Sequence, residues 1–268
     1  MKTKKFLMLA LVALSFVACK KSDDTIDFPA QIDQVINELT LSFDSLNADL
    51  SANTAAIAQN MSDTAATRVK LLNMFNQSSF VDEFSFITPQ GILQIIEPSE
   101  YYSEQGLDIS GQDHVVKVFQ TKLPVLSQTF QLVEGFEAAI IIHPILNNNQ
   151  IAGALSCVLK PEMILGREIL PFVEGQDFEI WVMEKGGNVL FDQDTEEIGL
   201  NVITDPLYED FPELIAAAEL INDSESGQTS YSFYQTGTNT KVVKETYWKT
   251  LHICDNEWKI IWVIPVQL

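Results

Sequence analysis

Few residues in this chain stand in a pattern that supports a chemical reaction. The three histidines, His114, His143 and His252, lie far apart and lack the spacing of metal ligands. The acidic segment from Asp192 to Glu197 resembles a calcium-binding loop, but Glu197 stands where such a loop needs glycine, so we interpret it as a solvated turn. The sequence shows no nucleophile elbow, phosphate-binding loop or zinc-protease signature. It therefore predicts no catalytic residue, no metal and no cofactor, and a hydrolase is the third of three hypotheses.

The clearest signal for covalent modification is Cys19. Three lysines precede an apolar run from Phe6 to Val17, which is too short to span a bilayer comfortably and is typical of a secretory signal peptide. Residues 16–19, with Phe in place of the usual Leu, resemble a bacterial lipoprotein lipobox. This resemblance implies that residues 1–18 are removed, that Cys19 carries acyl chains such as palmitate, and that residues 19–27 form a tether. The alternative is an ordinary cleaved signal with an incidental cysteine.

The lipobox also implies a location. Asp23 and Asp24 resemble the surface-export tag of Bacteroidetes lipoproteins, so we expect a lipid-anchored protein of the cell envelope, on the periplasmic or surface side of the outer membrane. The formal net charge is −21, and loss of residues 1–18 with their three lysines makes it −24. Such a balance disfavours nucleic acid as a partner, and a polybasic membrane patch as well. Membrane attachment would therefore depend on lipid.

Two further cysteines remain after Cys19. Cys157 lies in an apolar, strand-like run and Cys254 lies near a turn. We expect two separate thiols, with a disulfide as the alternative, because spacing alone does not place the two residues within bridging distance.

A long apolar stripe dominates the first part of the mature chain. Apolar residues recur at three- and four-residue steps through residues 28–76, and glycine and proline are absent between Ala30 and Phe75. This pattern predicts one long helix, whose weakest point is residues 51–54. At 1.5 Å per residue it would extend on the order of 70 Å. It should therefore run beside more than one unit or pair with a second copy of itself.

The remainder of the chain reads as two similar units, residues 77–175 and 176–268. Each begins with a predicted hairpin and continues with a helix and further strands, and the two related Gly-Leu segments, Gly106-Leu107 and Gly199-Leu200, lie about 95 residues apart. Helices are expected at Asp108–Thr121 and Tyr208–Ile221. The fold class is α+β, with two tandem antiparallel sheets after the long helix.

The order of these elements resembles the double Cache family, the PAS-like extracytoplasmic sensor domains of chemoreceptors and histidine kinases. The resemblance covers about residues 28–268. It is carried by the sequences ITPQGI (87–92), GLDISGQDHV (106–115), PVLS (124–127), VEGF (133–136), IWVM (180–183), EIG (197–199), TDPLY (204–208) and EWKI (257–260), together with Gly187. It implies a membrane-distal first unit, a membrane-proximal second unit and a small-molecule ligand.

The chain departs from the family at two points. Members that bind amino acids hold the ligand carboxylate with an arginine, but the corresponding stretch here, Ser110–His114, contains none. The second transmembrane helix and the transmitter are also missing, so a signal is expected to pass to another membrane protein.

The resemblance places the ligand between the first sheet and the loops around the predicted helix. The side chains of suitable chemistry there are Tyr101, Tyr102, Asp108, Gln112, His114, Ser127 and Glu134. Aromatic and acceptor groups without an arginine suit a neutral or cationic ligand better than an anion. Each residue alone also has a structural interpretation; Asp108, for example, is a natural helix cap.

Two hypotheses follow. In the first, the protein is a lipid-anchored, sensor-like Cache protein that captures a polar solute or presents it to a membrane partner. In the second, it is a structural or interaction lipoprotein that dimerises through its N-terminal helix and binds no ligand. Polar residues converging on a closed cavity would favour the first, whereas large apolar side chains filling that cavity would favour the second.

Overall fold

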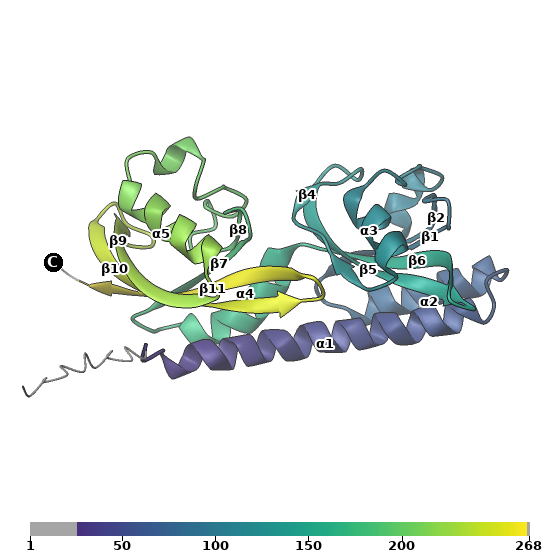
Figure 1. Ribbon diagram of the computed structural model, residues 1–268, viewed down its shortest axis with the longest axis horizontal. Coiled ribbons are helices and arrows are strands. Elements are labelled where there is room, and N and C mark those ends of the chain that lie inside the picture. The colour runs from purple at the N-terminus through teal and green to yellow at the C-terminus, as the bar shows by residue number, and fades with distance from the viewer. Residues whose placement is uncertain (1–25, 267–268) are drawn as a thin grey trace, which may run out of the picture.

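A computed structural model describes residues 26–266 as two antiparallel sheets arranged along one long helix (Figure 1). The helix, α1 (Ala30–Ala58), lies on the same side of both sheets. A cleaved signal and a lipid on Cys19 fall outside the described residues. Within residues 26–266, no helix combines the length and the apolar character needed to cross a membrane.

The long helix predicted over residues 28–76 is instead two helices. After α1, residues 59–63 break the helix, and α2 (Thr64–Gln77) begins with Asp63, whose Oδ1 accepts a hydrogen bond from the Ala66 N–H at 2.8 Å. Polar side chains at this break compete with helical backbone hydrogen bonds, which favours a helix start. The break lets α2 pack on β1 and β2, while α1 packs on β5 and β6.

The first sheet has the strand order β2-β1-β6-β5-β3, with β4 paired to β5. Its strands are β1 (Val81–Ile87), β2 (Leu93–Glu97), β3 (Val125–Leu126), β4 (Phe130–Gln131), β5 (Glu137–Asn147) and β6 (Gln150–Leu159). The 3-10 helix η1 (Ser99–Glu104) follows β2, and α3 (Asp113–Thr121) packs on β5. All the strand pairs of this sheet are antiparallel.

The second sheet repeats this arrangement with the order β8-β7-β11-β10-β9. Its strands are β7 (Glu179–Glu184), β8 (Val189–Phe191), β9 (Ser226–Tyr234), β10 (Lys241–Ile253) and β11 (Asn256–Val266). The connecting helix α4 (Pro161–Val173) precedes it, and the 3-10 helix η2 (Pro206–Tyr208) and α5 (Pro212–Asp223) follow β8. The predicted α+β class with two tandem antiparallel sheets is confirmed.

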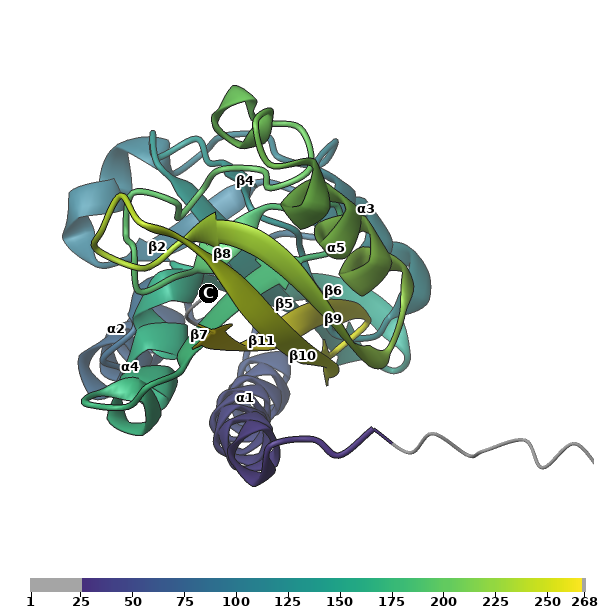
Figure 2. The ribbon, with the colours of Figure 1, turned by 90° about the vertical axis from the view of Figure 1, so that its left-hand side faces the viewer.

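Each sheet is covered on both faces (Figure 2). We call the face that packs on α1 the inner face and the opposite face, which carries α3 in the first unit and α5 in the second, the outer face. One apolar cluster joins α1, α4 and the inner faces of both sheets, and separate clusters lie on the two outer faces. In the shared cluster the rings of Phe43 and Trp258 meet edge to face at 5.3 Å.

This packing buries the apolar stripe of α1. Ile32, Val35, Leu39 and Leu50 are fully buried against the protein's own sheets. A dimer would therefore need a surface other than this stripe. The four tryptophans are buried. Cys157 and Cys254 are free thiols, as expected, the first buried and the second exposed.

Two predicted helices begin later than expected. The helix expected from Asp108 starts at Asp113, because the Asp108 Oδ1 accepts the Ser110 N–H at 2.9 Å and so forms a local turn five residues upstream. The helix expected from Tyr208 starts at Pro212, after η2. Proline favours the first position of a helix, which explains that boundary.

Candidate functional site

Polar side chains enter the outer-face core of the first unit from its two central strands. Along β1, Phe84 and Phe86 belong to the inner core, so Glu83 and Ser85 point to the outer face. Ser85 lies opposite Ser156 of β6, and their hydroxyl oxygens are 2.5 Å apart. All three polar side chains are almost completely buried.

These residues enclose a small cavity of about 20 Å³. Gln112 and His114, at the start of α3, close one side, and Glu134, in the turn between β4 and β5, closes another. The remaining lining residues are apolar: Leu93, Ile109, Leu132, Val133, Ile140 and Val158. A cavity of this size holds about one water molecule.

The electrostatics of the cavity depend on burial. Desolvation, and then the neighbouring Glu134 carboxylate, raise the pKa of Glu83 far above its usual value. Burial lowers the pKa of His114 to about 4. At neutral pH the cavity therefore contains a protonated Glu83 and a neutral imidazole. Among the described residues, the buried Glu83 Oε2 and His114 Nε2 have no hydrogen-bond partner, so a polar group that entered the cavity could pair with them.

The seven residues predicted from the sequence lie in three different places. Gln112, His114 and Glu134 line the cavity. Ser127 does not: its Oγ accepts the Ile140 N–H at 2.9 Å, and it lines a cleft between the units.

The other three predicted residues lie away from both spaces. The Tyr102 hydroxyl donates to Glu97 at 2.6 Å, under the Arg68 guanidinium. Tyr101 packs against Phe136, with ring centroids 6.1 Å apart. Asp108 is exposed and forms the local turn described above, and its hydrogen bonds with Ser110 lower the pKa of its carboxyl.

Sequence analysis missed Glu83, Ser85 and Ser156. All three lie in strands that the sequence predicted only approximately, and each stands beside apolar residues that dominate the pattern. The signal was present in the alternation: Glu83 and Ser85 flank Phe84, and Ser156 stands between Leu155 and Cys157. Polar residues at every second position of an otherwise apolar strand indicate a polar site on one face.

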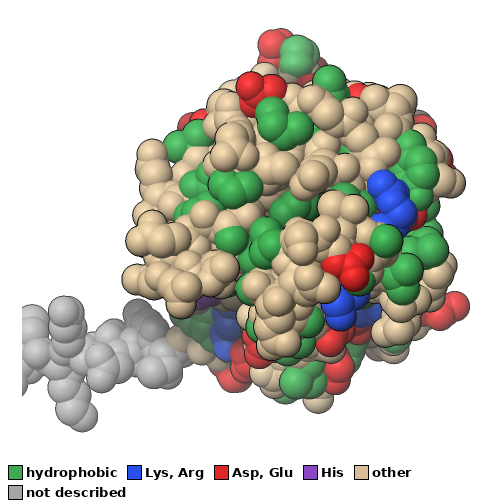
Figure 3. Space-filling model, turned by 90° about the vertical axis from the view of Figure 1, so that its right-hand side faces the viewer, with side chains coloured by type: hydrophobic (Ala, Val, Ile, Leu, Met, Phe, Trp, Pro, Cys, Tyr) green, Lys and Arg blue, Asp and Glu red, His purple; other side chains and the backbone are tan. Residues whose placement is uncertain are grey.

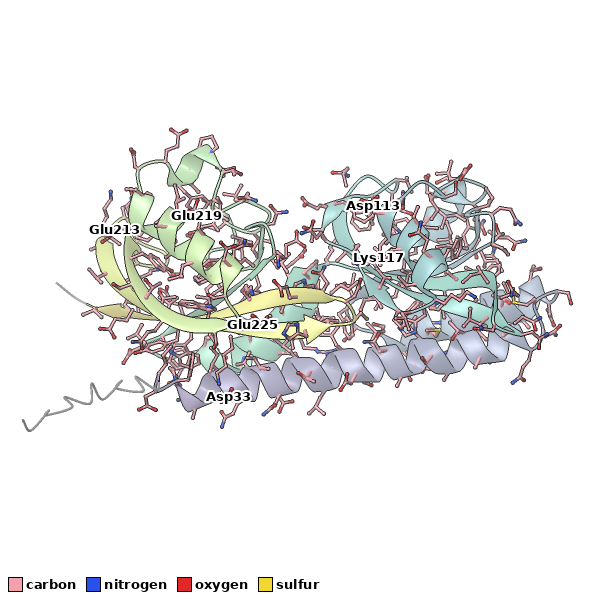
Figure 4. The ribbon with its side chains drawn as sticks, viewed as in Figure 1. Asp33, Asp113, Lys117, Glu213, Glu219 and Glu225 are labelled. Atoms are coloured by element: carbon pink, nitrogen blue, oxygen red, sulfur yellow. The ribbon has the colours of Figure 1, made fainter. Side chains whose placement is uncertain are left out.

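An open cleft of about 630 Å³ separates the outer parts of the two units, next to the first cavity. Asp113 and Lys117 extend from α3 on the side facing the second unit (Figure 4), and Lys117 forms an ion pair with Asp255. Gln112 and His114 line both the cleft and the cavity. These two side chains therefore form the partition between them.

Hydrogen bonds cross from one unit to the other beside this cleft. The Thr129 hydroxyl and N–H both donate to the carboxylate of Glu184, at 2.5 and 3.0 Å. The Asn256 Nδ2 donates to the carbonyls of Leu126 and Ser127, at 3.3 and 3.1 Å. The edge of the first site is thus attached directly to the strands of the second unit.

The second unit has a larger cavity at the equivalent place, on its outer face, of about 240 Å³. Asp192, Asp194, Glu196 and Glu197 form one wall. The solvated turn predicted for this segment is therefore wrong in part: Asp192 and Glu197 are partly buried, because the chain after β8 folds over the apolar outer face. Glycine is still missing from the calcium-loop position, and residues 26–266 contain no group of three His, Cys, Asp or Glu side chains placed to hold a metal ion.

At the end of the molecule formed by the first unit, the described surface shows no large apolar or charged patch. In that view, hydrophobic side chains are scattered among polar ones and acidic side chains lie mainly at the rim (Figure 3). Exposed apolar residues of this dispersed kind are normal for a folded protein.

Comparison with solved structures defines the class of fold. The architecture is that of Cache and PAS-like sensor domains, with a long N-terminal helix and two antiparallel sheets. Residues 41–161, less than half of the chain, match the family described as HK/GC/chemotaxis protein-like sensor domain. No protein of curated function matches the sequence.

Three structures illustrate the likeness. An extracellular ligand-binding receptor from Desulfohalobium retbaense is 22% identical with a TM-score of 0.67; the match covers 88% of this chain but 41% of the receptor. The ligand-binding domain of the Pseudomonas fluorescens chemoreceptor CtaA, in complex with L-alanine, is 13% identical with a TM-score of 0.62, covering 88% and 94% of the two chains. That of the Pseudomonas aeruginosa amino acid chemoreceptor PctC, in complex with GABA, is 11% identical with a TM-score of 0.62, covering 87% and 96%.

Proposed function

We propose that this chain is a lipid-anchored, extracytoplasmic, sensor-like protein that binds a small polar solute in its first unit and presents it to a membrane partner. The acyl anchor at Cys19, on the outer membrane, belongs to this proposal, as does the absence of enzymatic activity. The fold shared with ligand-binding domains of chemoreceptors supports a binding role. The observation that carries the proposal is the buried polar cavity around Glu83 and Glu134.

The composition of this cavity favours a neutral or cationic solute. Two carboxyl groups, two hydroxyls, an amide and an imidazole line it, and its described lining includes no lysine or arginine. A ligand carboxylate would face Glu83 and Glu134 without a compensating charge. An ammonium group would instead replace the proton that Glu83 holds at neutral pH, and the carboxylates of Glu83 and Glu134 would then both accept hydrogen bonds from it.

A ligand larger than water requires the cavity to open. The turn formed by residues 132–136 is the natural element to move, because it supplies Glu134, Leu132 and Val133 to the lining and Gly135 adopts a positive φ of 92° there. Outward movement of this turn would separate Glu134 from Glu83. Binding would then couple to the position of a segment that directly precedes β5, the strand on which α1 packs.

The test uses the chain from Lys20, which keeps every described residue and lacks the acylated cysteine. Thermal unfolding is measured against amines, amino acids, purines, carboxylates and sugars. A ligand at a hundredfold excess over its Kd adds about 2.7 kcal/mol of stability, which is visible as a higher Tm. We expect amines or neutral polar solutes to raise the Tm and carboxylates without an amino group to have no effect.

Matched variants locate the site. Glu134→Gln should weaken binding of an ammonium ligand at least tenfold, whereas Glu219→Gln, on the exposed face of α5 (Figure 4), should leave it unchanged. Because the ligand displaces a proton from Glu83, affinity should also rise with pH, by up to tenfold per unit below the raised pKa of Glu83. Unchanged affinity in Glu134→Gln would count against the site, and no shift with any compound class would favour the interaction-protein hypothesis.

A further inference from the structure

The cavity of the second unit has a different chemistry and enough room for an organic molecule. Its volume of about 240 Å³ is about twelve times the 20 Å³ of the cavity in the first unit. It lies between the outer face of the second sheet, the segment after β8 and the turn joining β9 to β10. None of its lining residues belongs to the first unit, so it is a separate space.

One wall of this cavity is acidic. The Asp192 Oδ1 accepts the Asp194 N–H at 2.7 Å, and the Glu197 Oε2 accepts the Tyr208 hydroxyl at 3.0 Å. Asp194 and Glu196 add two further carboxylates. Burial, and then the charge of Glu197, raise the pKa of Asp192 to about 8, which means that this wall carries more acidic groups than it can ionise without a cation.

The basic residue in the lining, Lys244, offsets the charge of this wall only in part, because its attraction for Asp192 and Glu197 is outweighed by the burial of these two carboxyl groups. Lys244 donates to the Glu179 Oε2 at 2.6 Å, and both side chains are largely buried. Its charge is therefore already matched by a carboxylate outside the acidic wall. The described lining holds four acidic side chains against this one engaged lysine.

The opposite wall is aromatic. Phe211 packs edge to face on Phe233 and on Tyr234, with centroid distances of 4.7 and 5.2 Å. The Lys241 Nζ, outside the lining, lies 4.4 Å from the Phe211 centroid, and the Lys244 Nζ lies 5.7 Å from the Phe233 centroid, so both rings already attract a protein cation. Trp181, 6% exposed, also lines the cavity, and its buried Nε1 donor has no hydrogen-bond partner among residues 26–266.

We propose that the second unit is a further binding site, for a small organic ammonium compound with an apolar or aromatic body and a hydrogen-bond acceptor. The ammonium group is held by Asp192 and Glu197, the body packs on Phe211 and Phe233, and the acceptor receives the Trp181 Nε1–H. An anionic ligand is excluded by the acidic wall. This site is independent of the one proposed in the first unit.

The test compares three compounds of the same shape and different charge by isothermal titration at pH 7. Tyramine carries an ammonium group, 4-hydroxyphenethyl alcohol is neutral, and 4-hydroxyphenylacetate is an anion. With the chain from Lys20, tyramine should bind at least tenfold more tightly than the alcohol, and the acetate should not bind. Equal affinity for tyramine and the alcohol overturns the proposal, and this comparison needs no variant.

Variants assign the site. Asp192→Asn and Glu197→Gln should each weaken tyramine binding about tenfold with little effect on the alcohol, while Glu219→Gln should change neither. Glu134→Gln, in the first unit, should also leave tyramine affinity unchanged. If Glu134→Gln abolishes binding and Asp192→Asn does not, the ligand occupies the first unit, which overturns this inference and supports the proposed function.

Discussion

The two units place a cavity at the same position in the same fold but treat a buried acid in opposite ways. The outer face of β1 carries Glu83, and that of β7 carries Glu179, each at an early position of the first strand of its sheet. Glu179 forms an ion pair with Lys244, whereas burial keeps Glu83 protonated beside Glu134. The fold therefore fixes where a cavity forms, and the partner residues of its acids decide what the cavity can bind.

The cavities also differ in closure. In the first unit, the turn at residues 132–136 and the start of α3 close around about 20 Å³. In the second, aromatic rings and the acidic segment leave about 240 Å³. A ligand of the first site must therefore open it, which costs free energy but links binding to movement, whereas the second site is already formed.

The largest expected effect concerns the core that the two units share. Phe43→Ala should destabilise the protein by about 3–5 kcal/mol, because the ring is buried against Trp258 and its removal leaves a cavity. Since the α1 cluster contacts both inner faces, both units should lose stability together. Urea unfolding followed by hydrogen exchange in each sheet would measure this. Leu41→Ala, on the exposed side of α1, is the control, and loss confined to one unit would show that the units unfold independently.

The next effect should be confined to the second unit. At Gly227 a Cβ would overlap the indole ring of Trp248, which is 2% exposed on the outer face. Gly227→Ala should therefore cost about 2–3 kcal/mol through displacement of that ring. Gly111→Ala, where a Cβ meets nothing within 4 Å, is the matched control in the first unit. Denaturant unfolding gives the comparison, and equal stability of the two variants would contradict it.

The sequence predicted the layers of this protein better than its sites. Apolar periodicity at three- and four-residue steps identified the α1 stripe. A helix that buries one face needs apolar residues at these short intervals, so the pattern is visible within the segment itself. The cavity could be found only in part. His114 and Glu134 were recognised at a helix start and in a loop. Glu83 lies beside them only because β1 pairs with β6, which is over 70 residues further along the chain. The second cavity was missed because Asp192–Glu197 reads as a polar turn until the outer face of the sheet is known.

A pH series would sharpen the contrast between the two acids. Because the pKa of Glu83 is raised in the folded state, the folded protein binds a proton that the unfolded chain has lost above its pKa of about 4.5. Stability from this group is therefore present at low pH and lost as pH rises toward the folded pKa. Glu83→Gln keeps the neutral shape, so its stability relative to the wild type should rise with pH above 4.5, by at most about 1.4 kcal/mol per pH unit.

His114 contributes with the opposite sign and in a different window. Its pKa falls from 6.5 to about 4 on folding, so its contribution to stability is complete above pH 6.5 and is lost as pH falls toward 4. Measurements between pH 6.5 and 8 therefore isolate the carboxyl groups. Glu219→Gln serves as the control for charge removal alone. A difference between Glu83→Gln and the wild type that is constant over this range would mean that Glu83 is ionised in the folded protein.

The smallest effect tests whether the two units communicate. Thr129→Val removes the hydroxyl that donates to Glu184 at 2.5 Å, but Glu184 keeps the Thr129 N–H and the Asn188 Nδ2 at 3.0 Å. The carboxylate is not left without partners, so the cost should be only about 1 kcal/mol.

The same variant tests coupling between ligand binding in the first unit and the stability of β7 in the second. Thr129 precedes β4 directly, and β4 leads into the turn that carries Glu134. In the wild type, an ammonium ligand of the first site should slow hydrogen exchange in β7, and Thr129→Val should reduce that protection while affinity stays within a few-fold. Full protection of β7 in the variant would show that the shared α1 core, and not this hydrogen bond, connects the units.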